Sequence, residues 1–353
     1  MRTETTLHFI SHDGESIFYR HWAATEPSTE KKAIMLFHRG HEHSGRIAHL
    51  VDELDLPDYD FFAWDARGCG QSPGARGDAP NFGWMVHDAE SFFQHIQSEY
   101  NIQAENIAVI AQSVGAVIAS TWVHDYVPKI RALVLASPAF KVKLYVPFAI
   151  PGLRLMYNIR GNFFVNSYVK SHYLTHDEER QESFNADPLV ERPISTKILL
   201  DLFDTSKRIV ADAASIHVPT QLLISGSDWV VKRKPQTTFF KNLSSKTKEM
   251  HVLKGFYHDT LGEKYRGIPI HKARTFIEKA FSQPIETPNL INADKVGYTA
   301  EESKKLAKPE KCLFKKMYWA FTKKGLCFAS RTSDGVKLGI ETGFDSGSTL
   351  DYV

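Results

Sequence analysis

The stretch "VIAQSVGAV" (Val109–Val117) places a serine between an apolar run and a set of small residues. The apolar residues before it predict a β-strand, and the residues after it predict a helix. A serine at this junction is either a routine helix start or a nucleophile held on a sharp strand-to-helix turn. Ala111 and Gly115 lie two positions before and after Ser113. The segment therefore resembles the G-x-S-x-G pattern of such a turn, with alanine in place of the first glycine. The turn can still form if the backbone angles of Ala111 suit an L-residue.

Strand-like and helical patterns alternate from the start of the chain to about Gln283. The strand-like runs lie at 33–37, 61–64, 107–111, 132–137, 221–225 and 250–253. Amphipathic helices are predicted at 84–100 and 271–283. This alternation predicts an α/β fold with a mostly parallel, doubly wound sheet covered by helices on both faces. The segment 8–22 carries Asp-Gly between two β-rich runs and predicts an antiparallel hairpin.

The segment between Ser137 and His217 interrupts the alternation, because it contains aromatic-rich and charged helical pieces but no obvious strand. Connections in compact domains are usually short, so we expect a helical cap at about 138–217 rather than two crossover helices with long loops. A first domain that includes this cap is therefore predicted at 1–283. Residues 284–311 have the composition of a linker, and 312–353 form a basic-aromatic extension that could begin a second domain.

Composition excludes several classes of protein. Of the 353 residues, 42% are hydrophobic and 24% charged, and the net charge of +2 gives no strong field for nucleic acid. Three scattered cysteines form neither a disulfide framework nor a zinc pattern, which favours a reducing compartment such as the cytoplasm. The N-terminus lacks an apolar signal core, and the most apolar run (144–159) is too short and interrupted to span a bilayer.

A serine nucleophile needs a base and an acid that orients the base. In the predicted sheet these partners follow in the order serine, acid, histidine. Asp228 comes just after the strand at 221–225, and His258 lies in a loop after the strand at 250–253. We therefore predict a Ser113–Asp228–His258 triad. Asp228 alone could instead be a helix N-cap, and Asp259 is a rival acid that we reject because adjacent side chains in a loop rarely face each other.

The oxyanion of an acyl-transfer intermediate requires backbone N–H donors. We expect them from Val114, which follows the nucleophile, and from Gly40 in the loop after an early strand. The same loop is rich in histidine, but His38, His41 and His43 lack a regular ligand spacing, so we expect neither a metal nor a cofactor.

Several segments together resemble the monoacylglycerol lipases and bacterial lysophospholipases of the α/β-hydrolase fold. They are "HRGHEHSGR" (38–46), "DARGCGQSPGARG" (65–77), "AQSVG" (111–115), "SHYLTHDEERQESFNADPLV" (171–190) and "GFYHDTLGE" (255–263). The resemblance covers about 5–282 and implies Ser113, Asp228 and His258 as the triad. It also implies Gly40 and Val114 as oxyanion donors. Arg39 and His41 depart from the family, where small residues stand, and are expected to narrow or charge that side of the pocket. The spacing of "RGCGQSPG" does not fit dinucleotide binding.

The C-terminal "FDSGSTLDYV" (344–353) resembles the junction in bifunctional chains that join such a hydrolase to a class I methyltransferase. No methyltransferase glycine motif is visible, so no methyl-donor cofactor is predicted. The stretch "KCLFKKMYWAFTKKGLCF" (311–328) suits either a membrane surface or a helix docked on its own protein.

Three functions are compatible with these residues. The leading one is hydrolysis of lysophospholipid or monoacylglycerol esters, because the apolar residues at 140–169 suit an acyl chain and the basic ones a phosphate. The second is a peptidase that removes N-terminal residues, for which Glu178, Glu179 and Glu182 are acids in the cap but look like a solvated helix face. The third is a binding module that has lost turnover.

Overall fold

The chain divides into two compact units, 1–287 and 288–353, which are considered separately. A computed structural model describes residues 2–26, 28–167, 169–284, 327–332 and 335–340. Most of the predicted linker (284–311) and C-terminal extension (312–353) therefore lie outside the described residues.

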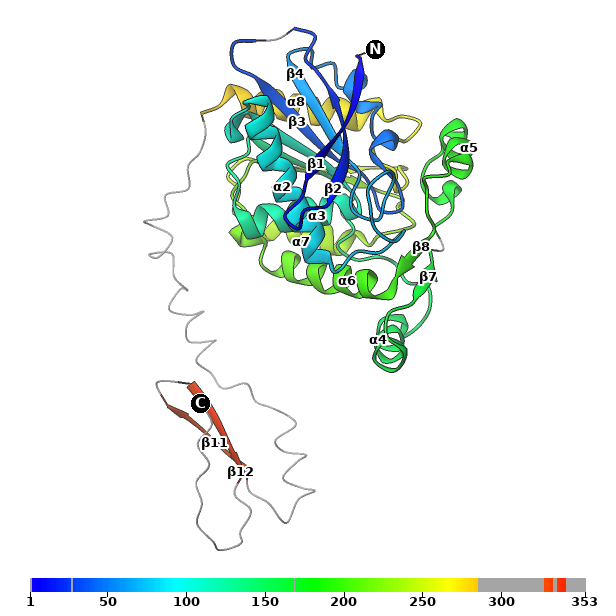
Figure 1. The fold of residues 1–353 in the computed structure, drawn as a ribbon, viewed down its shortest axis with the longest axis vertical. Coiled ribbons are helices and arrows are strands. Elements are labelled where there is room, and N and C mark those ends of the chain that lie inside the picture. The colour runs from blue at the N-terminus through cyan, green and yellow to red at the C-terminus, as the bar shows by residue number, and fades with distance from the viewer. Residues whose placement is uncertain (1, 27, 168, 285–326, 333–334, 341–353) are drawn as a thin grey trace, which may run out of the picture. The chain divides into compact units, whose positions relative to one another are not determined.

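An eight-stranded sheet forms the centre of the first unit (Figure 1). Its strands are β1 (Glu4–Ile10), β2 (Ser16–Trp22), β3 (Lys32–Phe37), β4 (Tyr59–Trp64), β5 (Ile107–Gln112), β6 (Ala132–Ala136), β9 (Thr220–Ser225) and β10 (Lys248–Leu253). They lie in the order β1-β2-β4-β3-β5-β6-β9-β10. Neighbours from β4 to β10 are parallel, whereas β2 pairs antiparallel with both β1 and β4. All six predicted strands and the mostly parallel, doubly wound sheet are confirmed.

The predicted N-terminal hairpin is also confirmed, since Ile10 of β1 pairs with Ser16 of β2 around the Asp-Gly turn. Gly14 adopts a φ of 89°, a left-handed conformation that a residue with a side chain rarely takes.

The helices are α1 (Leu50–Glu53), α2 (Phe82–Tyr100), α3 (Val114–Tyr126), α4 (Ala149–Arg160), α5 (Glu178–Ala186), α6 (Thr196–Ala211), α7 (Arg233–Asn242) and α8 (Gly267–Ser282). All except α4 and α5, which belong to the insertion, cover the two faces of the sheet. Short 3₁₀ turns occur at η1 (Ser44–Arg46), η2 (Ala104–Asn106), η3 (Ser171–Tyr173) and η4 (Ala213–Ser215).

Two hydrophobic cores lie on opposite faces of the sheet because side chains alternate along each strand. Ile34 and Leu36 of β3 pack in the core that contains α1 and α8, while Met35 and Phe37 pack in the core that contains α2, α3, α6 and α7. Almost every residue of the inner parallel strands β3, β5, β6 and β9 is buried, which is the reason the sequence shows them as continuous apolar runs.

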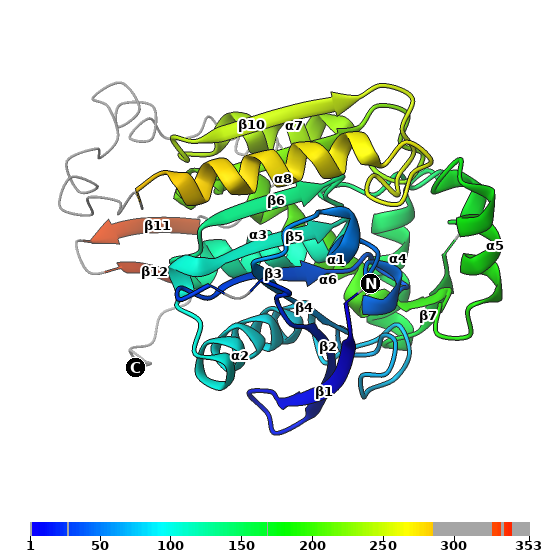
Figure 2. The ribbon, with the colours of Figure 1, turned by 90° about the horizontal axis from the view of Figure 1, so that it is seen from above.

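The insertion between β6 and β9 contains α4, α5 and a second small sheet. In this sheet β7 (Phe164–Asn166) pairs antiparallel with β8 (Pro193–Ser195), a strand pair that the sequence analysis did not identify beside the helices of the cap. Figure 2 shows α5 and β7 beyond the carboxyl ends of the parallel strands. The last helix of the insertion, α6, packs against α3 and α7 beside the sheet.

The described part of the second unit is an antiparallel pair of strands. β11 (Cys327–Thr332) pairs with β12 (Gly335–Ile340), with Cys327 opposite Ile340. Among the described residues of the chain, no helix combines the length and apolar character that crossing a membrane requires.

Helix α3 approaches β3 so closely that Gly115 has no room for a side chain, since an added Cβ would overlap the carbonyl oxygen of His38. Gly115→Ala is therefore expected to lower the free energy of unfolding by about 1–3 kcal/mol, the usual cost of overpacking. Gly152→Ala on α4 is the control, because nothing lies within 4 Å of its added methyl group. Its free energy of unfolding should equal that of wild type or exceed it by up to about 1 kcal/mol. Urea denaturation measures both, and equal effects would contradict this account of the packing.

Candidate functional site

Ser113 stands at the turn from β5 into α3, with φ 55° and ψ −116°. This conformation is strained for any residue with a side chain. Two backbone hydrogen bonds hold it, from Ser113 N–H to the carbonyl of Ala136 (3.0 Å) and from Ala139 N–H to the carbonyl of Ser113 (3.0 Å). Ala111 lies within β5, where it pairs with Phe37 of β3 in an ordinary extended conformation, so alanine fits where the common pattern has glycine.

The structure brings Ser113, His258 and Asp228 together in a hydrogen-bonded chain. Ser113 Oγ lies 2.7 Å from His258 Nε2, and His258 Nδ1 lies 2.8 Å from Asp228 Oδ2. The histidine comes from the loop after β10 and the aspartate from the loop after β9. All three side chains are buried or nearly so.

Asp228 is fixed by its own loop as well as by His258. Its second oxygen accepts hydrogen bonds from the N–H groups of Val230 (2.7 Å) and Val231 (2.9 Å). Burial opposes ionisation of this carboxyl, but the charge and hydrogen bond of His258 and the two backbone N–H groups outweigh it and lower the pKa of Asp228. The helix that follows begins at Arg233 with Lys232 as its N-cap, so Asp228 does not cap it.

The ionised carboxylate of Asp228 accepts the Nδ1–H of His258, which leaves Nε2 to accept the hydroxyl proton of Ser113. This is the arrangement in which an imidazole can remove a proton from an alcohol and later return it to a leaving group.

Gly40 and Val114 line the same pocket as Ser113 and His258. A Cβ at Gly40 would lie 2.8 Å from Val114 Cγ2, so the side chain of Val114 packs directly against Gly40. Val114 is the first residue of α3, and its N–H has no partner within the helix. The two predicted oxyanion donors thus lie side by side next to the serine.

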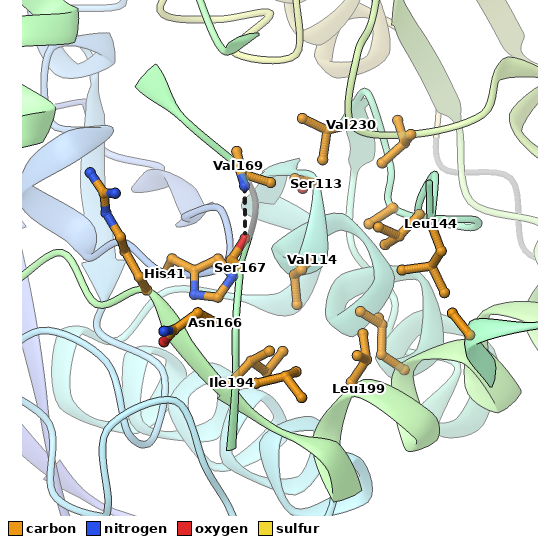
Figure 3. A pocket seen from close by; sticks show the side chains of 18 of the residues that line it. His41, Ser113, Val114, Leu144, Asn166, Ser167, Val169, Ile194, Leu199 and Val230 are labelled. Atoms are coloured by element: carbon orange, nitrogen blue, oxygen red, sulfur yellow. Dashed lines mark hydrogen bonds between the residues drawn. The ribbon is translucent and has the colours of Figure 1, made fainter. Parts of the chain in front are cut away.

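A pocket of about 510 Å³ opens above Ser113, between the sheet and the inserted segment. Its walls are mainly aliphatic, including Leu144, Val169, Ile194, Leu199 and Val230, and Figure 3 shows these side chains around the serine. Such a volume and lining are typical of a site for a small apolar ligand.

The rival acid Asp259 has other partners. Its carboxylate accepts from Arg180 Nε (2.6 Å) and Gln112 Nε2 (3.0 Å) and lies 3.4 Å from Arg39. Arg39 also forms an ion pair with Glu42. The charge that Arg39 was expected to bring to the pocket is therefore balanced by two buried carboxylates.

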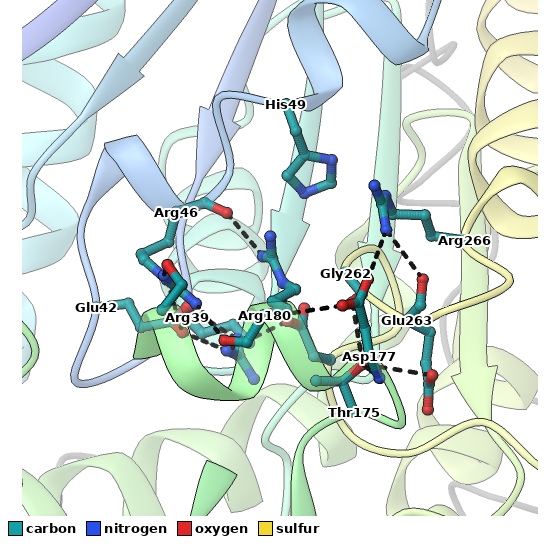
Figure 4. Close-up of polar contacts among 12 residues, drawn as sticks. Arg39, Glu42, Arg46, His49, Thr175, Asp177, Arg180, Gly262, Glu263 and Arg266 are labelled. Atoms are coloured by element: carbon teal, nitrogen blue, oxygen red, sulfur yellow. Dashed lines mark hydrogen bonds and ion pairs between the residues drawn. The ribbon is translucent and has the colours of Figure 1, made fainter. Parts of the chain in front are cut away.

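This buried ion network joins three parts of the chain. Arg180 belongs to α5, Arg39 and Arg46 to the loop after β3, and Asp259 to the histidine loop. Figure 4 shows Arg180 reaching Arg46, whose carbonyl accepts from Arg180 at 2.7 Å. Sequence reasoning missed Arg180, because a charged residue on a charged helix face carries no sign that it will bind a buried carboxylate.

Two of the three histidines at 38–43, His38 and His43, have protein partners at both ring nitrogens. His38 Nδ1 donates to the carbonyl of Arg39 (2.6 Å), and its Nε2 accepts from the N–H of Ala66 (2.9 Å). His43 Nε2 donates to Asp187 (2.9 Å), and its Nδ1 accepts from Gly45 N–H (3.2 Å). Neither ring has a nitrogen left for a metal ion.

Residues 28–265 match the sequence profile of a family described as serine aminopeptidase, S33. The chain belongs to this family of α/β-hydrolases. A solved structure, the monoacylglycerol lipase of Paleococcus ferrophilus, superposes with a TM-score of 0.66 at 23% identity and covers 75% of this chain and 98% of that one. The predicted α/β-hydrolase fold is confirmed, and the chain is related to monoglyceride lipases and esterases.

Two curated relatives extend the comparison. Uncharacterized protein YnbC of Escherichia coli K12 is 51% identical over 346 residues, which make up 98% of this chain and 59% of that protein. The chain thus spans about three fifths of that relative's length. The monoglyceride lipase homolog of monkeypox virus is 22% identical over 277 residues, covering 78% of this chain and 94% of the viral protein. Residues 273–353 match a second family, described as putative methyltransferase, in line with the resemblance at the C-terminal end.

Asp259→Asn is expected to lower the free energy of unfolding by about 3 kcal/mol or more at neutral pH, because Arg39 and Arg180 lose a buried counter-charge. Asp125→Asn is the control, since its ion pair with Arg208 is partly exposed and should be worth less than about 1 kcal/mol. Urea denaturation of both variants gives the comparison, and similar losses would contradict a structural role for the network.

The ionisation of Asp259 should make part of the free energy of unfolding sensitive to acid. Burial opposes ionisation of Asp259, but the charges of Arg180 and Arg39 outweigh it and hold its pKa well below the usual value. A carboxyl whose pKa is lower in the folded state than in the unfolded state stabilises the fold when it is ionised. This stabilisation is fully present above the unfolded-state pKa of about 4 and is lost progressively as the pH falls below that value. The difference in stability between wild type and Asp259→Asn should therefore shrink from pH 6 to about pH 3. A constant difference would contradict the assignment.

Proposed function

We propose that the protein is a serine hydrolase that cleaves carboxylic esters of lipids, lysophospholipid or monoacylglycerol, through an acyl-enzyme. The observation that carries this proposal is the hydrogen-bonded chain of Ser113, His258 and Asp228 at the floor of an aliphatic pocket. The names of its monoglyceride lipase relatives agree with a lipid ester as substrate.

In the proposed reaction, Ser113 Oγ attacks the ester carbonyl while His258 Nε2 takes the hydroxyl proton. The backbone N–H groups of Gly40 and Val114 donate to the oxyanion of the tetrahedral intermediate. As the C–O bond to the alcohol breaks, His258 returns the proton to the leaving oxygen. Water, deprotonated by the same imidazole, then attacks the acyl-enzyme and releases the fatty acid.

The aliphatic walls favour an acyl chain on energetic grounds. Each methylene group that leaves water for the pocket contributes about 0.8 kcal/mol. Leu144, Leu199 and Leu202 belong to the inserted segment. The insertion would therefore supply much of the binding energy, and the sheet would supply the reacting groups.

A second candidate is an aminopeptidase-like activity, which needs an acid to hold the amine of the substrate. Glu178, Glu179 and Glu182 are exposed on α5 and do not line the pocket. Glu191, however, lies in the pocket wall and offers a carboxylate that the sequence reasoning did not single out. Because a carboxylate in the pocket wall could bind the amine of a substrate, we retain the aminopeptidase-like activity as the alternative to ester hydrolysis.

A substrate panel separates the candidates. We expect turnover of monoacylglycerols, lysophospholipids and p-nitrophenyl esters, with kcat/KM rising as the acyl chain lengthens, and none of aminoacyl anilides. Hydrolysis of the anilides alone would favour the peptidase. A wild-type protein that turns over no substrate in the panel would favour the third candidate, a binding module on the same fold.

Ser113→Ala is expected to lower kcat for every ester by about 10⁴-fold or more, because the nucleophile is lost. Ser120→Ala is the matched control, since Ser120 is also buried in the neighbouring helix but bonds only the carbonyl of Ala116. Initial rates with one p-nitrophenyl ester measure both. Comparable activity of Ser113→Ala and wild type would refute the proposed nucleophile.

A further inference from the structure

His41 occupies a backbone conformation that favours glycine. Its φ is 68°, in the left-handed region where a side chain is strained. It directly follows Gly40, the residue proposed to donate to the oxyanion. A strained residue beside the proposed nucleophile and oxyanion donor points to a role for its side chain in binding.

The imidazole of His41 lines the pocket above Ser113, next to Asn166 and Ser167 of the inserted segment (Figure 3). Within the ranges that the structure describes, it hydrogen bonds to no other side chain. His38 and His43, its neighbours in the loop, have partners at both ring nitrogens. His41 is thus the histidine of this loop that is available to a ligand.

Burial in the pocket favours the neutral form of the His41 ring, and this form limits the ligand groups that it can bind. Burial lowers the pKa of His41, and hydrogen bonding to the backbone of Glu191, which favours the protonated ring, does not outweigh it. A neutral imidazole has one N–H donor and one bare nitrogen acceptor. The bare nitrogen of such a ring can accept a hydrogen bond from a hydroxyl group of a ligand in the pocket.

The polar lining residues of the pocket lie together on one side of the serine, beside the aliphatic Val169 and Ile194. Figure 3 places His41, Asn166 and Ser167 on one side of Ser113, and Leu144 and Leu199 on the other. An ester whose carbonyl lies at Ser113 extends its acyl chain to one side and its alcohol to the other. The aliphatic side suits the acyl chain, so the alcohol part would lie against His41.

We propose that His41 is a specificity-determining residue that accepts a hydrogen bond from a free hydroxyl on the alcohol part of the substrate. This inference rests on the proposed function. It selects esters of polyhydroxy alcohols, such as a glycerol carrying one acyl chain, over esters of simple alcohols with the same chain.

Non-hydrolysable ethers test this binding without turnover. The probes are 1-O-octylglycerol and methyl octyl ether, with dissociation constants measured by calorimetry on wild type, His41→Gly and His41→Asn. Wild type should bind the glycerol ether about five- to tenfold more tightly, the effect of one or two neutral hydrogen bonds. His41→Gly, which relaxes the backbone, should lose this preference. His41→Asn should keep part of it, because asparagine tolerates positive φ and its amide oxygen accepts a hydrogen bond.

The inference would be overturned if wild type bound neither ether or did not prefer the glycerol ether. It would also be overturned if His41→Gly kept the preference, or if this variant bound both ethers more weakly by the same factor. Since neither ether is cleaved, these outcomes are independent of catalysis. A protein that binds as predicted but hydrolyses no ester would instead refute the proposed function.

Discussion

The strained backbone of Ser113 is the constraint on which the site depends. Its φ of 55° lifts the hydroxyl out of the line of β5 toward His258, 2.7 Å away, and starts α3 directly after it. Such a conformation persists only where the surroundings fix it. Hydrogen bonds to Ala136 and Ala139 do so, as does the close packing of Gly115 against the carbonyl of His38. The packing around the sheet therefore fixes the position of the Ser113 hydroxyl relative to His258.

A second level of organisation is electrostatic. The loop that carries His258 continues into Asp259, which is bound to Arg180 of the insertion and to Arg39 of the loop after β3. The same two loops provide His258 and the proposed donor Gly40. One buried carboxylate thus links the position of the base, the position of a donor and the attachment of α5 over the pocket. An unpaired charge in such a place would be costly, so these elements are expected to move together.

The sequence predicted those features that have local signals. The buried strands appear as apolar runs, and Ser113, Asp228 and His258 each follow a strand end, so their meeting at one edge of the sheet could be foreseen. The strands β7 and β8 have three residues each, too few to show a period. The contact between Arg180 and Asp259 joins residues 79 positions apart, and the pairing of Arg39 with two carboxylates depends on tertiary structure. The lowered pKa of His41 likewise comes from burial, which no sequence motif records.

The most direct test of the account is the site and rate of covalent modification by a fluorophosphonate, followed by intact mass and peptide mapping. The account predicts a single adduct, in which the oxygen of Ser113 has displaced fluoride from phosphorus. It also predicts a labelling rate at least about 10³-fold lower in His258→Ala, because the hydroxyl then lacks its base. A wild-type protein that remains unlabelled, an adduct on another residue, or labelling that is indifferent to His258 would contradict it.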